Sequence, residues 1–200
     1  MNAGQRFARL VTDLVVRHPA LWRLFRGPLR SQFDKLAPQW DARRDAQAFE
    51  PVRVALDKLS EPPHRALDLG TGTGSVARIL AERYPEADIV GVDISERMLD
   101  EARRRTDSPR VRYDAADAER LPYDDASFDL VTLGNMIPFF DELARVVAPG
   151  GHVLFAFSAG PQTPIYVSSD RLRAELTRRG FAEFAEVSAG RGTALLATRR

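Results

Sequence analysis

Three alternating glycines follow a short apolar run, and their type and spacing are the first sign of chemistry in the chain. The stretch reads "RALDLGTGTGSVARIL", and its glycines are Gly70, Gly72 and Gly74. Glycine has no Cβ, so a ligand can approach the backbone closely there. The apolar run before the glycines predicts a strand, and the apolar spacing after them predicts a helix. We therefore expect a ligand where this strand passes into this helix.

Acidic residues mark the ends of the first three predicted strands. Asp68 lies in the first strand, Asp93 ends "DIVGVD" and Asp117 ends "VRYDAAD". Ligands of open α/β sheets bind beyond the carboxyl ends of the strands, and these strand ends supply no Lys or Arg. Carboxylates accept hydrogen bonds from ribose hydroxyls and amino groups, whereas a pyrophosphate favours basic groups. The pattern favours a ligand with adenine, ribose and an amino-acid tail but no phosphate.

Each acid has an expected partner on such a ligand. Asp93 follows Gly70 by 23 residues, close to the spacing at which an acid receives ribose hydroxyls. Asp117 would accept from the adenine amine, and Asp68 would face the ammonium of the tail, directly or through water. Other roles stay open. Asp68 has the alternative role of a helix cap, Asp93 that of N-terminal charge for the next helix, and Asp117 that of a turn residue, with Asp114 as its rival.

Short apolar runs alternate with helical patterns from residue 65 onward. The predicted strands are 65–70, 88–93, 111–117, 128–135 and 152–158, and the predicted helices are 75–84, 95–105, 139–147 and 169–180. This alternation implies a parallel sheet with helices on both faces. Residues 181–188 and 193–199 fit an antiparallel hairpin. We predict an α/β, Rossmann-like, doubly wound, seven-stranded and mostly parallel sheet with an antiparallel C-terminal strand.

Local signals refine the ends of these elements. Ser95 is a predicted N-cap and Gly180 a predicted C-cap, and "APGG" at 148–151 predicts a turn. Gly27-Pro28 is expected to end a helical stretch.

Helical patterns also precede the predicted sheet. They begin at Phe7 and continue at about 29–36 and 42–59. We predict an N-terminal helical extension or lid over residues 1–60 and a ligand-binding core over residues 61–200, divided at "EPPH".

Charge is distributed unevenly along the chain. The net charge is +1, but residues 1–44 carry +6 and the remaining 156 residues carry −5. A nucleic-acid partner is not expected for the molecule as a whole. A helix with arginines opposite Phe and Leu can lie on an anionic membrane surface, although a solvated helix face is the favoured interpretation.

The chain contains no cysteine, which excludes disulfides, thiolate metal sites and cysteine nucleophiles. We predict no bound metal. No apolar run approaches membrane-spanning length, and Arg9, Asp13 and Arg17 interrupt any N-terminal signal sequence. A cytoplasmic location is expected.

Four stretches resemble, in order and spacing, the motifs of class I S-adenosylmethionine-dependent methyltransferases. They are "LDLGTGTGSVA", "IVGVDISERML", "YDAADAERLPYDDASFDLV" and "ELARVVAPGGHVLF". The most similar group is the small-molecule one that includes the ubiquinone/menaquinone methyltransferases, and "FDKLAPQWD" resembles the segment before the core in that group. The resemblance covers about residues 33–157. It implies S-adenosylmethionine as cofactor and methyl transfer to a small-molecule acceptor.

The resemblance also implies roles for residues around the adenine and the methionine. Gly70 and Gly72 would let the loop pass the methionine portion of the cofactor. Ile94 would pack on the adenine, Met98 would add an apolar wall, and Ala118 would offer its backbone to the adenine.

Two further pairs of residues gain roles in the same way. Gly134 and Asn135 would place a carbonyl near the ammonium, with a turn as the alternative role of Asn135. Phe33 and Trp40 lie where the substrate cover of this group lies, and their helical spacing leaves plain packing as the alternative.

No catalytic residue is predicted. Many members of the resembling family carry two histidines just after the fourth strand, where this chain has Ile137, Pro138, Phe139 and Phe140. The histidines of this chain, His18, His64 and His152, lie off the predicted rim. A sulfonium is a good leaving group, so in-line positioning can supply much of the rate.

Two alternative functions stay open. One is an NAD(P)-dependent oxidoreductase on a similar fold, against which stand the missing basic partner for phosphate and the missing Tyr-x-x-x-Lys pair. The other is a non-catalytic S-adenosylmethionine-binding protein, which the lack of an obvious base leaves possible.

Overall fold

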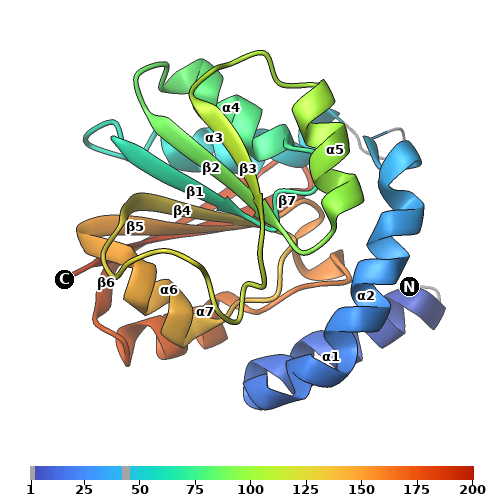
Figure 1. Cartoon of the computed structure of the whole chain (residues 1–200). Helices are drawn as coiled ribbons and strands as arrows, with labels where there is room; N and C mark the ends of the chain where they lie inside the picture. Colours follow the sequence, from blue (N-terminus) through green and yellow to red (C-terminus); the bar gives the residue numbers. More distant parts are fainter. Residues whose placement is uncertain (1–2, 42–45) are drawn as a thin grey trace.

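A mixed sheet of seven strands forms the centre of the protein (Figure 1). The computed structural model describes residues 3–41 and 46–200. The strands are β1 (Arg65–Leu69), β2 (Asp88–Asp93), β3 (Val111–Ala115), β4 (Phe128–Gly134), β5 (Val147–Phe157), β6 (Phe181–Ala189) and β7 (Gly192–Arg199), in the order β3-β2-β1-β4-β5-β7-β6. β7 is antiparallel to both of its neighbours, and the other pairs are parallel. The predicted Rossmann-like sheet with a reversed C-terminal strand is confirmed.

Helices cover both faces of this sheet. α3 (Glu50–Leu56), α4 (Ser75–Arg83) and α5 (Glu96–Arg104) bury apolar side chains against one face, and α6 (Phe140–Val146) and α7 (Ser169–Thr177) bury theirs against the other. α3 falls within the predicted N-terminal extension, yet it packs against β5, β6 and β7. The region of the expected helix at 42–59 contains α3 and a 3-10 turn at Ala46–Phe49, and residues 42–45 lie outside the described residues.

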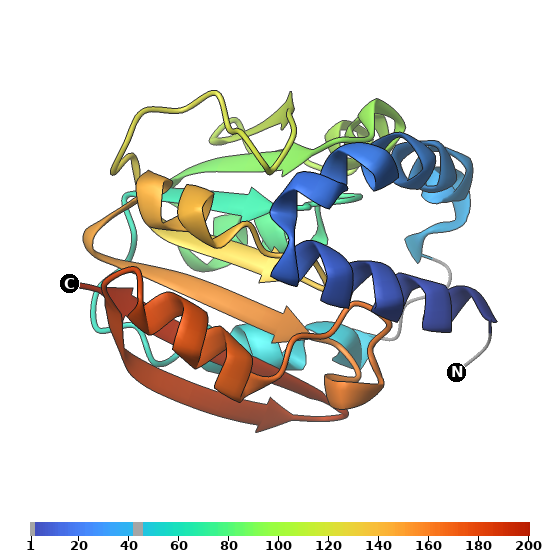
Figure 2. The ribbon, with the colours of Figure 1, turned by 90° about the horizontal axis from the view of Figure 1, so that it is seen from below.

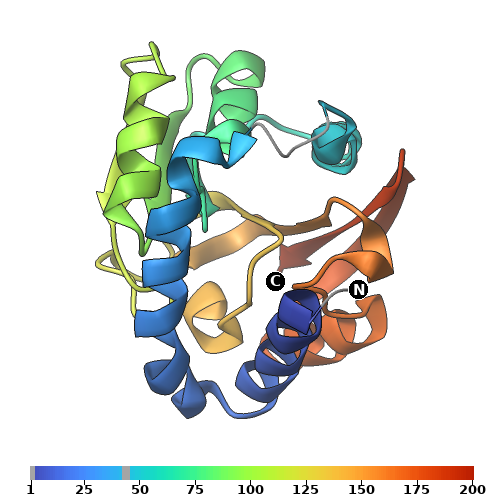
Figure 3. The same cartoon turned by 90° about the vertical axis from the view of Figure 1, so that its right-hand side faces the viewer.

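Two N-terminal helices form a V beside the carboxyl ends of the parallel strands (Figures 2 and 3). They are α1 (Ala3–Arg17) and α2 (Trp22–Leu36). Arg9 Nη2 holds α1 to the segment after β5, because it donates to the carbonyls of Pro161 and Thr163 at 2.6 Å. Within the described parts of the chain, no helix combines the length and apolar character needed to cross a membrane.

The prediction that Gly27-Pro28 ends a helix is wrong, because α2 continues through both residues. Proline lacks an N–H, so the carbonyl of Leu24 loses its helical donor. Both Leu24 and Pro28 are exposed, so water can reach that carbonyl. Tertiary contacts on either side of the proline hold the helix: Trp22 binds Asp117 and Asp34 binds Ser95. These contacts override the local signal.

The expected turn at 148–151 is also wrong, because these residues belong to β5. The pairing of β4 with β5 shifts register between Phe128 and Leu130, and Gly150 has φ +78°. A bulge of this kind admits turn-forming residues into a strand. The predicted N-cap is observed, since Ser95 Oγ accepts from the Met98 N–H at 3.2 Å. The predicted C-cap at Gly180 is wrong: Arg178 is the C-cap of α7, and Gly180, with φ +83°, lies in the turn that follows.

Tyr113 ties β2, β3 and the first turn of α4 together. A Cβ added to Gly91 would lie 2.5 Å from Tyr113 Cδ1, and one added to Gly74 would collide with the Tyr113 hydroxyl. That hydroxyl lies 2.8 Å from Thr106 Oγ1. Both glycines are therefore required for the packing of this buried ring.

Replacing Gly91 with alanine is expected to lower the free energy of unfolding by about 1–3 kcal/mol, because the new methyl group overpacks the ring of Tyr113. Gly134→Ala is the matched control, since its Cβ would lie 3.8 Å from Val76 in ordinary contact. Denaturant unfolding followed by circular dichroism measures both variants. Equal free energies of unfolding for the two would contradict the packing role of Gly91.

Candidate functional site

The residues singled out at the strand ends gather at the carboxyl edge of the sheet. β1 has β2 on one side and β4 on the other, so the chain reverses its direction of progress across the sheet at β1. Ligands of doubly wound sheets bind at such a switch point. α2 crosses this edge on the side of β2 and β3 (Figures 1 and 3).

The loop after β1 has a backbone that requires its glycines. Gly70, Gly72 and Gly74 have φ of +72°, +55° and +80°, a region that side chains with a Cβ rarely adopt. The N–H groups of Gly70 and Thr71 donate to the Val92 carbonyl at 2.8 and 2.9 Å. The loop is thus fixed to the end of β2.

Side chains from elsewhere lie against this loop. Met136 Sδ lies 2.5 Å from the position that a Cβ of Gly70 would take. Trp40 Nε1 lies 3.5 Å from the equivalent position at Gly72. Gly70 therefore allows a close approach, which Met136 makes in this structure. At Gly72 a Cβ would lie in ordinary contact with Trp40, so that glycine is required by its positive φ.

Asp68 is buried, with 1% of its surface exposed. Its carboxylate accepts from Thr71 Oγ1 at 2.6 Å, from Thr132 Oγ1 at 3.0 Å and from the Ala77 N–H at 3.1 Å. Ala77 lies in the first turn of α4, so Asp68 has the capping contact that was its alternative role. The carboxylate also borders the cavity described below.

Asp93 joins the glycine loop to the start of α5. One oxygen accepts from the Gly72 N–H and the other from the Ser95 N–H, both at 2.9 Å. Burial raises the pKa of Asp93; the backbone hydrogen bonds oppose this, and the nearby charge of Asp34 adds to it. The position of Asp93 at the end of β2, next to Gly72, is the one predicted for a ribose acceptor.

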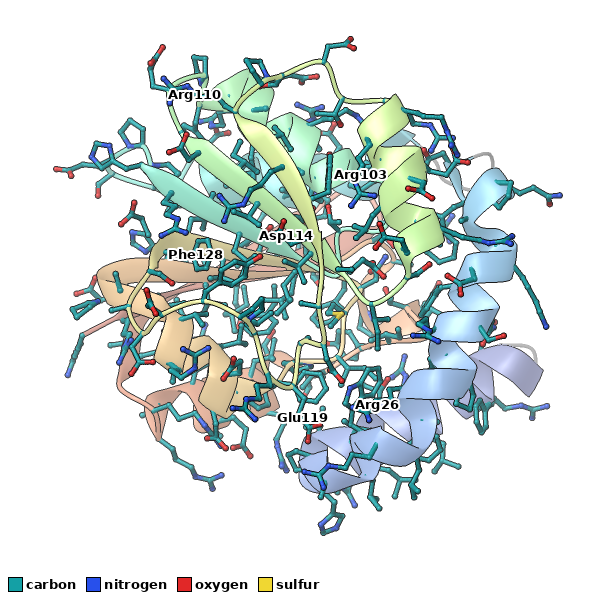
Figure 4. All side chains as sticks on the ribbon, viewed as in Figure 1. Arg26, Arg103, Arg110, Asp114, Glu119 and Phe128 are labelled. Carbon is teal, nitrogen blue, oxygen red and sulfur yellow. The ribbon has the colours of Figure 1, made fainter. Side chains whose placement is uncertain are left out.

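α2 occupies the polar groups on the adenine side of the predicted site. Trp22 Nε1 donates to Asp117 Oδ1 at 2.7 Å, and Arg26 lies 3.2 Å from Asp117 Oδ2. Farther along α2, Asp34 accepts from Ser95 Oγ at 2.6 Å. Figure 4 shows Arg26 beside the loop that follows β3.

That loop is braced from α6. Arg145 donates to the carbonyls of Leu121 and Tyr123 at 3.1 and 2.6 Å, and Glu142 accepts from the Leu121 N–H at 2.5 Å. Hydrogen bonds to Glu142 and Asp125 raise the pKa of Arg145, which keeps this brace charged. The brace fixes residues 121–123 of the loop that contains Asp117.

The apolar residues predicted for the adenine site are buried or partly buried. Ala118 is buried after β3, Met98 is buried in α5, and Ile94 packs partly exposed against the core. Their placement leaves Ile94 as the predicted adenine contact with a surface open to a ligand.

Asn135 follows β4 with φ +52°, a conformation that Asn tolerates better than most residues. Its Nδ2 donates to Ser158 Oγ and its Oδ1 accepts from the Ser158 N–H, both at 3.0 Å. The side chain thus closes a turn between the ends of β4 and β5, and its own carbonyl belongs to the rim.

A small cavity of about 30 Å3, partly open to solvent, lies between the glycine loop and the ends of β4 and β5. Its lining comes from α3 and the turn before it, the glycine loop, α4, β4 and β5, and includes Phe49, Val52, Asp68, Gly70, Asn135 and Ser158. Four residues predicted for the site border it: Asp68, Gly70, Gly134 and Asn135.

The predicted aromatic cover lies on the other side of the glycine loop. The rings of Phe33 and Trp40 pack edge to face with centroids 5.6 Å apart. Asp41, next to Trp40, accepts from Thr73 Oγ1 at 2.5 Å. The segment before the core therefore contacts the loop directly.

The structure divides the predicted residues between two places. Gly70 and the β4 end border the cavity, whereas Asp93, Asp117 and their neighbours lie beneath α2. Sequence reasoning missed Ser158 and Val52 as lining residues. Ser158 ends a predicted strand, so the strand-end rule applied to β5 would have found it; no local pattern marks Val52.

Comparison with known proteins shows which family the chain resembles. A model described as a methyltransferase domain matches residues 66–151. A demethylmenaquinone methyltransferase of Deinococcus radiodurans is 34% identical over 158 residues, which are 72% of this chain and 66% of that protein. A malonyl-[acyl-carrier protein] O-methyltransferase of Halorhodospira halophila is 38% identical over 152 residues, 68% of this chain and 49% of that protein. The chain spans about half to two thirds of the length of these relatives.

Solved structures agree on the fold. An S-adenosylmethionine-dependent methyltransferase from Aquifex aeolicus superposes with a TM-score of 0.67 at 20% identity, over 86% of this chain and 98% of that one. The [4+2]-cyclase SpnF reaches the same TM-score at 18% identity, over 86% and 94%, so the fold by itself does not determine the reaction. With the glycine loop and Asp93 at the switch point, the matched domain and the relatives agree: the chain belongs to the class I S-adenosylmethionine-dependent methyltransferases.

Proposed function

We propose that this protein transfers a methyl group from S-adenosylmethionine to a small-molecule acceptor. The observation that carries the proposal is the joint at the switch point, where the Gly72 N–H donates to Asp93 at 2.9 Å. This joint sets a glycine loop, whose first two glycines now face Met136 and Trp40, beside a carboxylate at the end of β2. The family membership supports the reaction, and the carboxylate supports a ribose in the site.

The residues present suit the parts of this cofactor. Asp93 would accept from the ribose hydroxyls, and Gly70 and Gly72 would lie along the methionine portion. Gly134 and Asn135, which border the cavity, would offer a backbone carbonyl to the ammonium. The bound cofactor supplies a methyl group on a sulfonium. The role of the chain is to hold donor and acceptor in line and to exclude water.

Binding of the adenine would require Asp117 to exchange its present hydrogen-bond donors for the adenine amine. Asp117 was predicted to accept from the adenine amine, and its oxygens now accept from Trp22 and Arg26. We infer that the adenine amine competes with the Trp22 indole for Asp117, with Ile94, Met98 and Ala118 forming the apolar part of this end.

No histidine serves as a base in this proposal. His152 lies in β5 beside Thr198, where burial lowers its pKa, and His18 and His64 are exposed. None of the three borders the cavity. An acceptor that ionises in water, or an amine, fits a site of this kind.

The acceptor itself is proposed only as a class. The relatives act, by name, on demethylmenaquinone and on malonyl-[acyl-carrier protein], and this chain is shorter than either. We propose that Phe33 and Trp40 cover the donor and acceptor, and that residues 1–60 serve as the lid of a core at 61–200 in a cytoplasmic protein.

The activity is tested with S-adenosylmethionine and a panel of phenols, quinols, amines and carboxylic acids. We expect S-adenosylhomocysteine to form with at least one acceptor, and Trp40→Ala to lower that turnover. Calorimetry compares binding of S-adenosylhomocysteine with binding of NAD. Tight binding of NAD without binding of S-adenosylhomocysteine would overturn the proposal, and binding without any turnover would favour a non-catalytic role.

Asp93→Asn is expected to weaken S-adenosylhomocysteine binding about ten- to hundredfold, because charge-assisted hydrogen bonds to the ribose are lost. Asp129→Asn is the matched control: Asp129 also accepts from two backbone N–H groups at 2.9 Å, near the amino end of β1. Equal affinities of the two variants, measured by calorimetry, would remove Asp93 from the site.

The affinity should also depend on pH through Asp93. Because its pKa is raised, acidification protonates it at a higher pH than an exposed aspartate, and affinity falls over that range. Asp93→Asn should lack this pH-dependent loss.

Trp22→Phe is expected to raise the affinity for S-adenosylhomocysteine by at least about threefold, because the competing donor to Asp117 is gone while an aromatic ring remains against Phe139. Tyr123→Phe is the matched control, since it removes a donor at 2.8 Å from Asp114. A rise in affinity with Tyr123→Phe instead would assign the adenine amine to Asp114.

A further inference from the structure

The N-terminal helices present large apolar side chains to solvent. Phe7 and Leu10 on α1 are 55% and 56% exposed, and Leu24 on α2 is 68% exposed. Phe7 and Leu10 are three residues apart, so they share one side of α1. The adjacent side of α1 buries Val11 and Val15 in the core, so the apolar surface of α1 extends from a covered side onto an exposed one.

The same two helices expose arginines. The term outer helical face is used below for six exposed residues of α1 and α2: Arg6, Phe7, Leu10, Arg17, Arg23 and Leu24. Asp13 is the exposed acid of α1. Across residues 3–41 and 46–200, no ion pair joins Arg6, Arg17 or Arg23 to an acid, whereas Arg26 is paired with Asp117. The guanidinium groups of this face are therefore free to meet an external anion.

We propose that the outer helical face docks onto an anionic lipid bilayer. Basic helices with apolar side chains bind in the headgroup region, where the apolar groups enter the acyl boundary and the arginines meet lipid phosphates. The charge of the chain is complementary to this partner: residues 1–44 carry +6, and the rest carries −5 and is repelled. Docking would therefore be confined to the N-terminal end of the molecule.

Other occupants fit this face less well. A two-fold dimer would place the face against itself and bring its arginines together. A nucleic acid would satisfy the arginines but would leave Phe7 and Leu10 against a phosphate backbone. A bilayer accepts both kinds of side chain at once.

The docked orientation would have a structural consequence for the site. α1 and α2 lie beside the carboxyl ends of the strands (Figures 2 and 3), so the same edge of the sheet would face the bilayer. The docking itself is independent of the proposed methyl transfer, because it needs neither cofactor nor acceptor.

Vesicle flotation tests the proposal with the full chain and no cofactor. We expect the protein to float with vesicles of equal parts phosphatidylcholine and phosphatidylglycerol, and to remain unbound with phosphatidylcholine alone. The variants Phe7→Ser/Leu10→Ser and Arg17→Ser/Arg23→Ser should each lower the partition at least about tenfold. A higher salt concentration should weaken the binding of the parent protein to the anionic vesicles, because salt screens the attraction between arginines and lipid phosphates.

The matched control is Arg110→Ser/Arg178→Ser, which removes the same charge away from the outer helical face; Arg110 lies far from α1 and α2 in Figure 4. Its partition should stay within about twofold of the parent, and thermal unfolding checks that every variant is folded. Failure of the parent protein to float with anionic vesicles would overturn the proposal. So would an equal loss in the control, or light scattering that shows a dimer dissociated by Phe7→Ser/Leu10→Ser.

Discussion

The joint between β1, β2 and α4 is the constraint on which the rest of the site depends. Within five residues the chain takes positive φ three times, at Gly70, Gly72 and Gly74. The loop is then fixed by the Val92 carbonyl and the Asp93 carboxylate. Without this turn α4 would not begin where Asp68 can cap it. The rim that any ligand meets is therefore set by backbone geometry before any side chain takes part.

The three glycines of this joint serve different ends. Gly74 is required because Tyr113 occupies the space where its Cβ would be, whereas Gly70 and Gly72 face Met136 and Trp40. A fixed ring excludes a Cβ at Gly74 and a movable side chain opposes one at Gly70, whereas Gly72 is required by its positive φ. All three positions are glycine in the sequence, and only the structure shows why each one is required.

The sheet was predictable because its signals are local and repeated. Apolar runs such as "DIVGVD" are buried on both faces and read as strands, and Ser95 marks the start of α5 by its own hydrogen bond. The course of α2 was not predictable, since Pro28 argues against a helix there and the opposing contacts reach across the chain to Asp117 and Ser95. For the same reason the acids at the strand ends could be found, but not their present partners.

The order of the strands has a consequence for how the chain assembles as it is made. β7 is synthesised after β6 yet lies between β6 and β5, so β6 has no place on the sheet until β7 has emerged. The packing of α3 is also completed only after β6 and β7 are made, because Val52, Ala55 and Leu56 are buried in the cluster that includes Val187 and Leu196. One face of the core is therefore completed last, by residues far apart in the chain, and such long-range closure slows folding.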